Sequence, residues 1–351
     1  MKLNQFGNTG LLISELTFGT MTFGGSSIWQ MLGATQQQEA DRLVARAIDG
    51  GINCFDSADI YSAGESERIL GAALEGRRQE VLIATKVKGR IGNGSNSAGL
   101  NRVHIMNQVE NSLRNLRTDY IDLYQIHGFD PFTPPEDTLR TLNDLVRSGK
   151  VRYIGVSNLA AWQIAYWAQH ARLSGLEPIQ SVQAYYSLAG RSLEREVVPA
   201  CKELGLGILV WSPLAGGFLS GKFRRDNAQV DGARRTDFDF PPVDKERSYD
   251  IIEVLAEIAD AHAVSIAQIA LAWVRMQPGV TSTIIGARRM DQLEDNLKSV
   301  DTELSSEELQ RLDAVSALGP EYPGWMVGMP SDRHPGFSFE DRVQALRDTA
   351  K

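Results

Sequence analysis

The chain alternates short, almost wholly apolar runs with segments in which apolar residues recur every three to four positions. One such segment places Ala40, Leu43, Val44, Ala47 and Ile48 on a single stripe, which predicts an amphipathic helix. The apolar runs are typical of parallel strands that are buried on both faces. We expect eight of these strands, which end near Gly19, Phe55, Lys86, Ile126, Val156, Gln183, Trp211 and Ile285.

A strand followed by a helix, repeated eight times, predicts a closed (β/α)8 TIM barrel. The run after the first strand, FGTMTFGGSS, lacks the GxGxxG turn typical of a doubly wound dinucleotide-binding sheet. The 351 residues exceed the roughly 250 of a bare barrel. We assign the excess to an N-terminal hairpin (1–14), a long loop after the seventh strand (212–244) and a C-terminal loop extension (317–351). No linker divides the sequence, so we expect a single domain over 1–351.

Composition and charge narrow the classes of function. The net charge is −8 and the basic residues form no long stripe, which argues against nucleic acid as a partner. Cys54 and Cys201 show neither CxxC spacing nor a His/Cys cluster, so we expect no metal site. The first residues lack a signal-peptide core, and no stretch reaches the ~20 apolar residues of a membrane span. We therefore expect a soluble, cytoplasmic protein, and the sequence does not set its oligomeric state.

Four polar residues stand at or just beyond the ends of successive predicted strands: Asp56, Tyr61, Lys86 and His127. In a barrel the carboxyl ends of the strands meet at one rim, where the chemistry of such folds takes place. A phenol has a pKa of about 10, and a nearby ammonium lowers that value. Lys86 would supply the ammonium, and Asp56 would hold it. His127 would orient a carbonyl oxygen by a hydrogen bond, while Tyr61 delivers a proton to it.

None of these four groups can supply a hydride, so reduction of a carbonyl needs a nicotinamide or flavin. The same rim offers partners for a nicotinamide, because Ser157, Asn158 and Gln183 can hydrogen-bond a carboxamide and Trp211 has a flat ring. The segment GGFLSGKF (216–223) nearly matches a Walker A loop, but Phe223 stands where a Ser or Thr would hold magnesium. We interpret this segment as a pyrophosphate cradle and not as a triphosphatase motif.

Six segments together resemble the aldo-keto reductase superfamily: FDSADIY (55–61), ATK (84–86), YQIH (124–127), GKVRYIGVSN (149–158), VWSPLAGGFLSGKF (210–223) and IIGARRMDQLEDN (284–296). The resemblance covers roughly Leu3 to Val315. With Trp211, the chain resembles the branch of this family that includes bacterial aldehyde reductases and potassium-channel β subunits more than the branch with tyrosine at this position.

The resemblance implies an NADP(H)-dependent oxidoreductase that interconverts aldehydes or ketones and alcohols, with Tyr61 as general acid/base. NAD(H) stays an alternative, although Arg288 suits a 2′-phosphate by charge and geometry. Arg234 or Arg235 would close over the cofactor. The expected cofactor contacts are Thr20, Met21, Asp56, Ser157, Asn158, Gln183, Trp211, Ser212, Pro213, Leu214, Ala215, Gly216, Lys222, Arg235, Gly286, Arg288, Gln292, Asp295 and Asn296.

Aromatic residues predict a broad apolar substrate pocket for aryl or bulky aliphatic carbonyls, with a sugar or a polycyclic alcohol as open alternatives. The expected substrate contacts are Phe23, Trp29, Tyr61, His127, Phe129 and Trp325, with Met21, Tyr322 and Met326 nearby. The sequence does not fix the direction of the reaction.

Two other functions stay open. In a class I aldolase-like lyase, Lys86 would form a Schiff base, but Asp56 beside it would keep the amine protonated. In a regulatory subunit of the potassium-channel β type, the bound NADP would serve partner binding instead of turnover.

Overall fold

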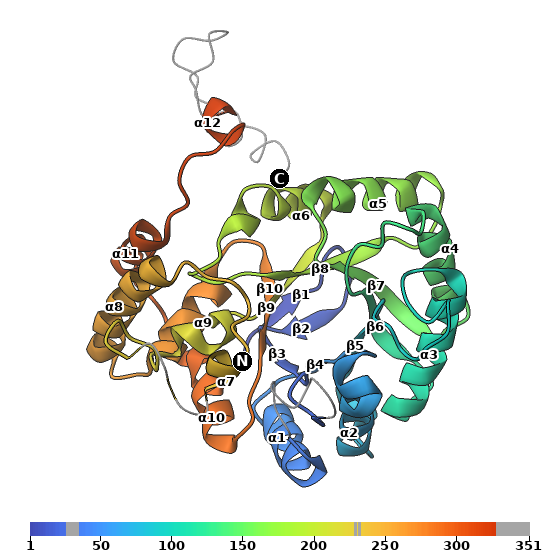
Figure 1. The fold of residues 1–351 in the computed structure, drawn as a ribbon, viewed down its shortest axis with the longest axis horizontal. Helices are drawn as coiled ribbons and strands as arrows, with labels where there is room; N and C mark the ends of the chain where they lie inside the picture. The colour runs from blue at the N-terminus through green and yellow to red at the C-terminus, as the bar shows by residue number, and fades with distance from the viewer. Residues whose placement is uncertain (26–34, 228–229, 231–232, 328–351) are drawn as a thin grey trace. The chain divides into compact units, whose positions relative to one another are not determined.

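The computed structural model describes residues 1–25, 35–227, 230 and 233–327 (Figure 1). It divides into two compact units, Met1–Ser316 and Ala317–Lys351, which are described separately. The predicted single domain over 1–351 therefore stays a prediction, and the barrel lies in the first unit.

Eight parallel strands close into a barrel in the order β10-β3-β4-β5-β6-β7-β8-β9. This confirms the predicted (β/α)8 fold. The core side chains of the strands are almost all buried, as expected for strands covered on both faces. The strands are β3 (Leu16–Gly19), β4 (Cys54–Asp56), β5 (Leu82–Val87), β6 (Ile121–Ile126), β7 (Val151–Ser157), β8 (Ile179–Tyr185), β9 (Gly207–Trp211) and β10 (Val280–Ile285).

Helices surround the barrel and bury their apolar stripes against its outer surface (Figure 1). The stripe predicted from Ala40 to Ile48 lies on α1, where Ala40, Leu43, Val44 and Ala47 are buried. The helices of this unit are α1 (Gln37–Asp49), α2 (Glu65–Ala73), α3 (Arg102–Leu116), α4 (Pro135–Arg147), α5 (Ala161–Leu173), α6 (Val197–Leu204), α7 (Arg234–Asp237), α8 (Lys245–His262), α9 (Ile266–Met276), α10 (Met290–Lys298) and α11 (Ser306–Ser316). Within the described residues no single helix has the length and apolar character to cross a membrane, and only α8 and α9, bent by 101°, meet these criteria as a pair.

The predicted hairpin is present as β1 (Leu3–Gln5) paired antiparallel with β2 (Leu12–Ser14). Because β2 leads directly into β3, the hairpin lies at the amino ends of the barrel strands. Phe6 and Ile13 pack there in one buried cluster with Cys54, Leu123 and Leu209 from the strands. The hairpin thus closes the end opposite to the predicted site.

The predicted loop 212–244 connects β9 to α8 and contains two short elements, η5 (Ala215–Ser220) and α7. Five of its described residues, Ser212, Ala215, Gly216, Gly217 and Gly221, have positive φ angles, so the backbone after β9 turns sharply. The second unit contains α12 (Gly324–Val327), in which Trp325 meets the ring of Tyr322 at 6.2 Å. The predicted contact of Trp325 with a substrate stays a prediction.

Candidate active site

The four predicted catalytic residues come together on adjacent strands. Asp56 ends β4, Lys86 lies on β5, His127 directly follows β6, and Tyr61 begins the short turn η2 (Tyr61–Gly64) after β4. Pairing of Asp56 with Ala84 and of Lys86 with Gln125 sets these strand ends side by side. The rings of Tyr61 and His127 meet edge to face with centroids 5.7 Å apart. The parallel register therefore forms the predicted cluster.

Lys86 is fully buried and has three oxygen partners. Its Nζ donates to Asp56 Oδ1 at 2.5 Å and to the carbonyl of Ser57 at 2.7 Å. It lies 3.4 Å from the hydroxyl of Tyr61. The other carboxylate oxygen of Asp56 accepts from Gln183 Nε2 at 2.7 Å and Gln125 Nε2 at 3.4 Å. The buried charges are thus paired and hydrogen-bonded, as burial requires.

The backbone after Tyr61 adopts three consecutive left-handed conformations. The φ angles are 48° at Ser62, 53° at Ala63 and 84° at Gly64. Ser62 fixes this turn, because its hydroxyl donates to the carbonyl of Phe23 and accepts from the N–H of Gly25, both at 3.0 Å. Such conformations are rare for residues other than glycine and cluster at functional sites. The turn fixes the tyrosine between α2 and the loop that follows β3.

Burial and charge set the protonation of the site. Burial raises the pKa of the Tyr61 phenol, and the Lys86 ammonium offsets part of that rise. Burial alone would lower the pKa of Lys86, but the pull of Asp56 and Tyr61 leaves it above its usual value. Burial, together with Lys86 and Lys88, lowers the pKa of His127 to about 3. At neutral pH the site therefore contains a protonated amine, a neutral phenol and a neutral imidazole.

A cleft of about 840 Å³ extends from Tyr61 and His127 to the start of α10. Its volume is in the range of cofactor and ligand sites. The predicted cofactor contacts that line it are Met21, Asp56, Asn158, Gln183, Trp211, Ser212, Pro213, Leu214, Gly216, Lys222, Arg235, Gly286, Arg288, Gln292, Asp295 and Asn296.

Several predicted contacts lie elsewhere. Thr20 and Ser157 are buried at the rim but outside the cleft wall, and the hydroxyl of Thr20 bonds to Asp56 O and Ser66. Ala215 is fully buried in the hydrophobic core.

Two of the predicted substrate contacts, Phe23 and Phe129, do not line the cleft. Phe23 is fully buried against Phe18 with ring centroids 6.0 Å apart, so the prediction that it lines the pocket is corrected to a core position. Phe129 packs half-buried against the same core and is not part of the cleft wall. Trp29 lies outside the described residues.

Trp211 belongs to a row of aromatic rings. Its Nε1 donates to Asn158 Oδ1 at 3.0 Å, which fixes the ring at the rim. Phe240 stacks on it at 5.8 Å with an interplanar angle of 7°, and Tyr185 meets it at 5.1 Å. Phe238 continues the row at 5.6 Å from Phe240. The flat face predicted for a nicotinamide is thus part of an aromatic wall supplied largely by the β9–α8 segment.

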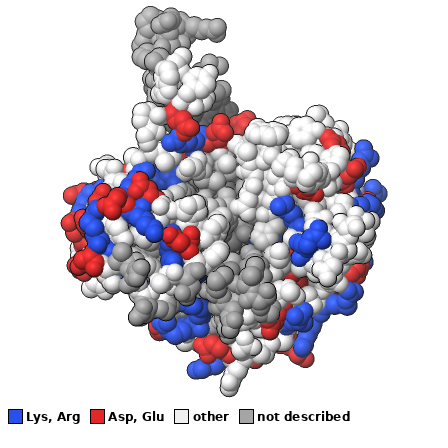
Figure 2. All heavy atoms as spheres, in the orientation of Figure 1, with Lys and Arg blue, Asp and Glu red and all other residues white. Residues whose placement is uncertain are grey.

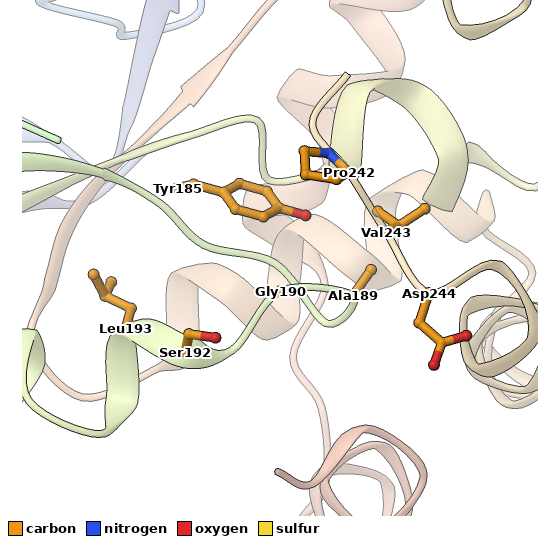
Figure 3. A pocket seen from close by; sticks show the side chains of 8 residues that line it. All are labelled: Tyr185, Ala189, Gly190, Ser192, Leu193, Pro242, Val243 and Asp244. Atoms are coloured by element: carbon orange, nitrogen blue, oxygen red, sulfur yellow. The ribbon is translucent and has the colours of Figure 1, made fainter. Parts of the chain in front are cut away.

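A second cavity of about 330 Å³ adjoins this wall (Figure 3). Tyr185 extends into it from β8, with Gly190 and Ser192 on one side and Pro242 and Val243 on the other. Because Tyr185 lines this cavity and also contacts Trp211, a single ring links it to the main cleft.

Cationic side chains gather in the middle of the main cleft. The guanidinium of Arg235 donates to the carbonyl of Ala215 and to Asp239, although its buried Nε has no hydrogen-bond partner. Arg234 lies over the ring of Phe238 at 5.8 Å, and its buried Nε has no hydrogen-bond partner. Burial beside Arg235 and Arg288 lowers the pKa of Arg234 to about 10. A buried cation with an unsatisfied donor suits an anionic ligand.

The far end of the cleft carries polar groups at the start of α9 and along α10. Gln292 Oε1 accepts from the N–H of Arg288 at 3.0 Å, and Asn296 Nδ2 donates to the carbonyl of Gly286 at 3.2 Å. Asp295 accepts from Ser265 Oγ at 2.7 Å and from Gln268 Nε2 at 2.6 Å. The sequence analysis did not assign Ser265, Ala267, Leu271, Phe238 or Phe240 to the cleft, although all five line it.

Groups of three or more His, Cys, Asp or Glu side chains that could hold a metal ion are not found within the described residues. Acidic and basic side chains are interspersed around the face shown in Figure 2.

A closed barrel with a buried Asp-Tyr-Lys-His cluster at the carboxyl ends of its strands defines a class of oxidoreductase scaffolds. The chain matches the aldo/keto reductase family model over residues 15–317 and belongs to that family. It is 38% identical to "Uncharacterized oxidoreductase YrpG" from Bacillus subtilis (strain 168) over 92% of this chain and 98% of the relative. Versiconal hemiacetal acetate reductase from Aspergillus parasiticus is 34% identical, over 92% and 99%. A probable voltage-gated potassium channel subunit beta from Oryza sativa subsp. japonica is 33% identical, over 92% and 98%.

Members of this family are oxidoreductases that act on small carbonyl compounds and generally use NAD(P)H. The cleft fits such a nucleotide in chemistry, because it combines an aromatic wall, amide side chains and a buried cation with an unsatisfied donor.

Proposed function

We propose that this protein is an NADP(H)-dependent reductase that interconverts aldehydes or ketones and alcohols, with Tyr61 as general acid/base. The observation that carries the proposal is the buried phenol of Tyr61, which lies 3.4 Å from the Lys86 ammonium and opens into the cleft beside His127. The nicotinamide, when bound, supplies the hydride that these side chains lack.

The chain's own residues handle the proton and the carbonyl oxygen. His127 is neutral at neutral pH. In the direction of reduction, it can donate a hydrogen bond that orients the carbonyl oxygen of the substrate. Tyr61 donates its proton as negative charge develops on that oxygen. Lys86 stabilises the resulting phenolate, while Asp56 keeps the ammonium in place. In the direction of oxidation, the phenolate accepts the proton from the alcohol.

Arg234 supports the choice of a phosphate-bearing coenzyme. Its side chain lines the cleft together with Tyr61 and Arg288, and both residues act on its charge. We assign Arg234 to the pyrophosphate of the coenzyme and Arg288 to a 2′-phosphate.

A Schiff-base lyase is disfavoured by the bonding of Lys86. Nucleophilic attack needs a neutral amine, whereas Asp56 and Tyr61 hold the pKa of Lys86 above its usual value. A regulatory role like that of a channel subunit rests on likeness to relatives with that printed name. Measured turnover would separate this role from the reductase.

The test is the variant Tyr61→Phe. We expect turnover of a model aldehyde to fall by at least about 10³-fold, because no other group at this position donates a proton. The dissociation constant for NADPH, from fluorescence titration, should stay within about threefold of the wild-type value. Wild-type turnover by Tyr61→Phe would refute the assignment of this residue as the acid.

A further inference from the structure

Lys88 lies beside the catalytic histidine. It directly follows β5, on the rim that carries Lys86 and His127. Its side chain crosses Gly128, because a Cβ atom on that glycine would lie 3.7 Å from Lys88 Nζ and 3.8 Å from its Cδ. The carbonyl of Lys88 accepts from the N–H of Gly99 at 2.9 Å, which ties both ends of the loop between β5 and α3 together. Gly128 is the residue after His127, so the ammonium lies close to the backbone that carries the imidazole.

The ammonium of Lys88 has no carboxylate within 4.0 Å among the residues that the structure describes. Asp130 is the nearby acid whose charge Lys88 influences. Its oxygens are already occupied, since Asp130 accepts from Leu100 N at 2.7 Å, Phe132 N at 3.0 Å and Thr133 Oγ1 at 2.7 Å. Lys88 thus carries a half-buried charge that the protein does not pair.

The charge of Lys88 reaches the catalytic residue. It acts on His127 together with Lys86 and helps to keep the imidazole neutral. Lys86 is paired with Asp56, whereas Lys88 has no such ion pair among the described residues. A substrate whose carbonyl oxygen is bonded by His127 and whose remaining atoms pass Gly128 would meet this ammonium.

We propose that Lys88 is a specificity-determining residue that binds an anionic group of the substrate, so that the preferred substrates are carbonyl compounds carrying a carboxylate or a similar anion. This inference rests on the proposed reductase function and adds the chemical class of its substrate. A half-buried ammonium attracts a carboxylate more strongly than an exposed one, because less solvent screens the pair.

The test compares two aldehydes of similar shape, 4-carboxybenzaldehyde and its methyl ester, with NADPH at saturation. In Lys88→Met we expect kcat/KM for the carboxylate to fall by about tenfold or more, mainly through KM, because the pairing charge is lost. The value for the ester should stay within about twofold. Lys88→Arg should retain the wild-type preference, and added KCl should weaken that preference in the wild type.

Arg90→Met is the matched control. Arg90 lies two residues further along the same loop and is exposed, with its guanidinium on the carbonyl of Gly94, so its removal should leave both aldehydes unaffected. An equal change for the two aldehydes in Lys88→Met, or none for either, would overturn the role of Lys88. A wild-type protein that reduces neither aldehyde would instead refute the reductase function on which the inference rests.

Discussion

The Lys86–Asp56 pair and Arg234, on two sides of the barrel rim, differ in how far the protein satisfies their polar groups. On the side of β4 to β6, Lys86 has three oxygen partners and Asp56 is bonded at both carboxylate oxygens. On the side of β9 and α8, Arg234 is largely buried with an unsatisfied Nε, and Trp211 lies in an aromatic wall that borders the cleft. The Lys86–Asp56 pair, which we propose supports proton transfer, therefore has its bonding partners within the protein (the preassembled side). Arg234, which we propose binds the nucleotide, has a donor that a ligand would complete (the nucleotide side).

The largest expected effect comes from breaking the preassembled side. Lys86→Met should lower the free energy of unfolding by about 3–5 kcal/mol, because Asp56 is then left as a buried charge without its partner. Urea denaturation followed by tryptophan fluorescence measures this change.

The double variant Asp56→Asn/Lys86→Met is the control for that experiment. Removing both charges should restore a large part of the lost stability, since no unpaired ion is then buried. The single variant Asp56→Asn is measured alongside. If the double variant loses as much free energy of unfolding as Lys86→Met and Asp56→Asn added together, the ion pair is not the cause.

On the nucleotide side, Arg234→Met should raise the dissociation constant for NADPH by about 10–100-fold, because one charge-assisted phosphate contact is lost. The free energy of unfolding should change little or increase, since a desolvated and unpaired cation is removed.

Arg235→Met is the matched variant for Arg234. Arg235 bonds to Ala215 O and Asp239, so its removal, unlike that of Arg234, should lower the melting temperature. Equal loss of stability in both variants would show that Arg234 is a structural residue like its neighbour.

A smaller effect is expected from pH. In the unfolded chain His127 takes up a proton below pH 6.5, whereas the folded protein holds its pKa at about 3. Its contribution to stability is therefore complete above pH 6.5 and is lost as the pH falls between those values, by about 2 kcal/mol at pH 5. The difference in free energy of unfolding between wild type and His127→Asn, measured at pH 7 and pH 5, isolates this contribution. Identical pH dependence of the two proteins would contradict the pKa assigned to His127.

The sequence predicts the preassembled side better than the nucleotide side. Asp56, Lys86 and His127 end regular, apolar strands, and parallel pairing then forces their side chains together. Gln125 was missed because its position inside a strand gave no signal that its amide reaches Asp56. The positions of Phe238 and Phe240 depend on the path of a long connection, which no periodic pattern encodes. For the same reason the sequence could not separate Arg234 from Arg235, which are distinguished by the bonds of Arg235 to Ala215 O and Asp239.

The left-handed turn after Tyr61 also bears on how such an enzyme can change over generations. Two of its residues, Ser62 and Ala63, hold a conformation that costs a residue other than glycine about 1 kcal/mol or more each. Glycine at these positions would remove that cost, but it would also loosen the segment that holds the phenol, and at position 62 it would delete the hydroxyl that bonds to Phe23. At Ala63, selection for heat resistance and selection for turnover therefore act in opposite directions, whereas at Ser62 the lost hydrogen bonds offset the gain in stability.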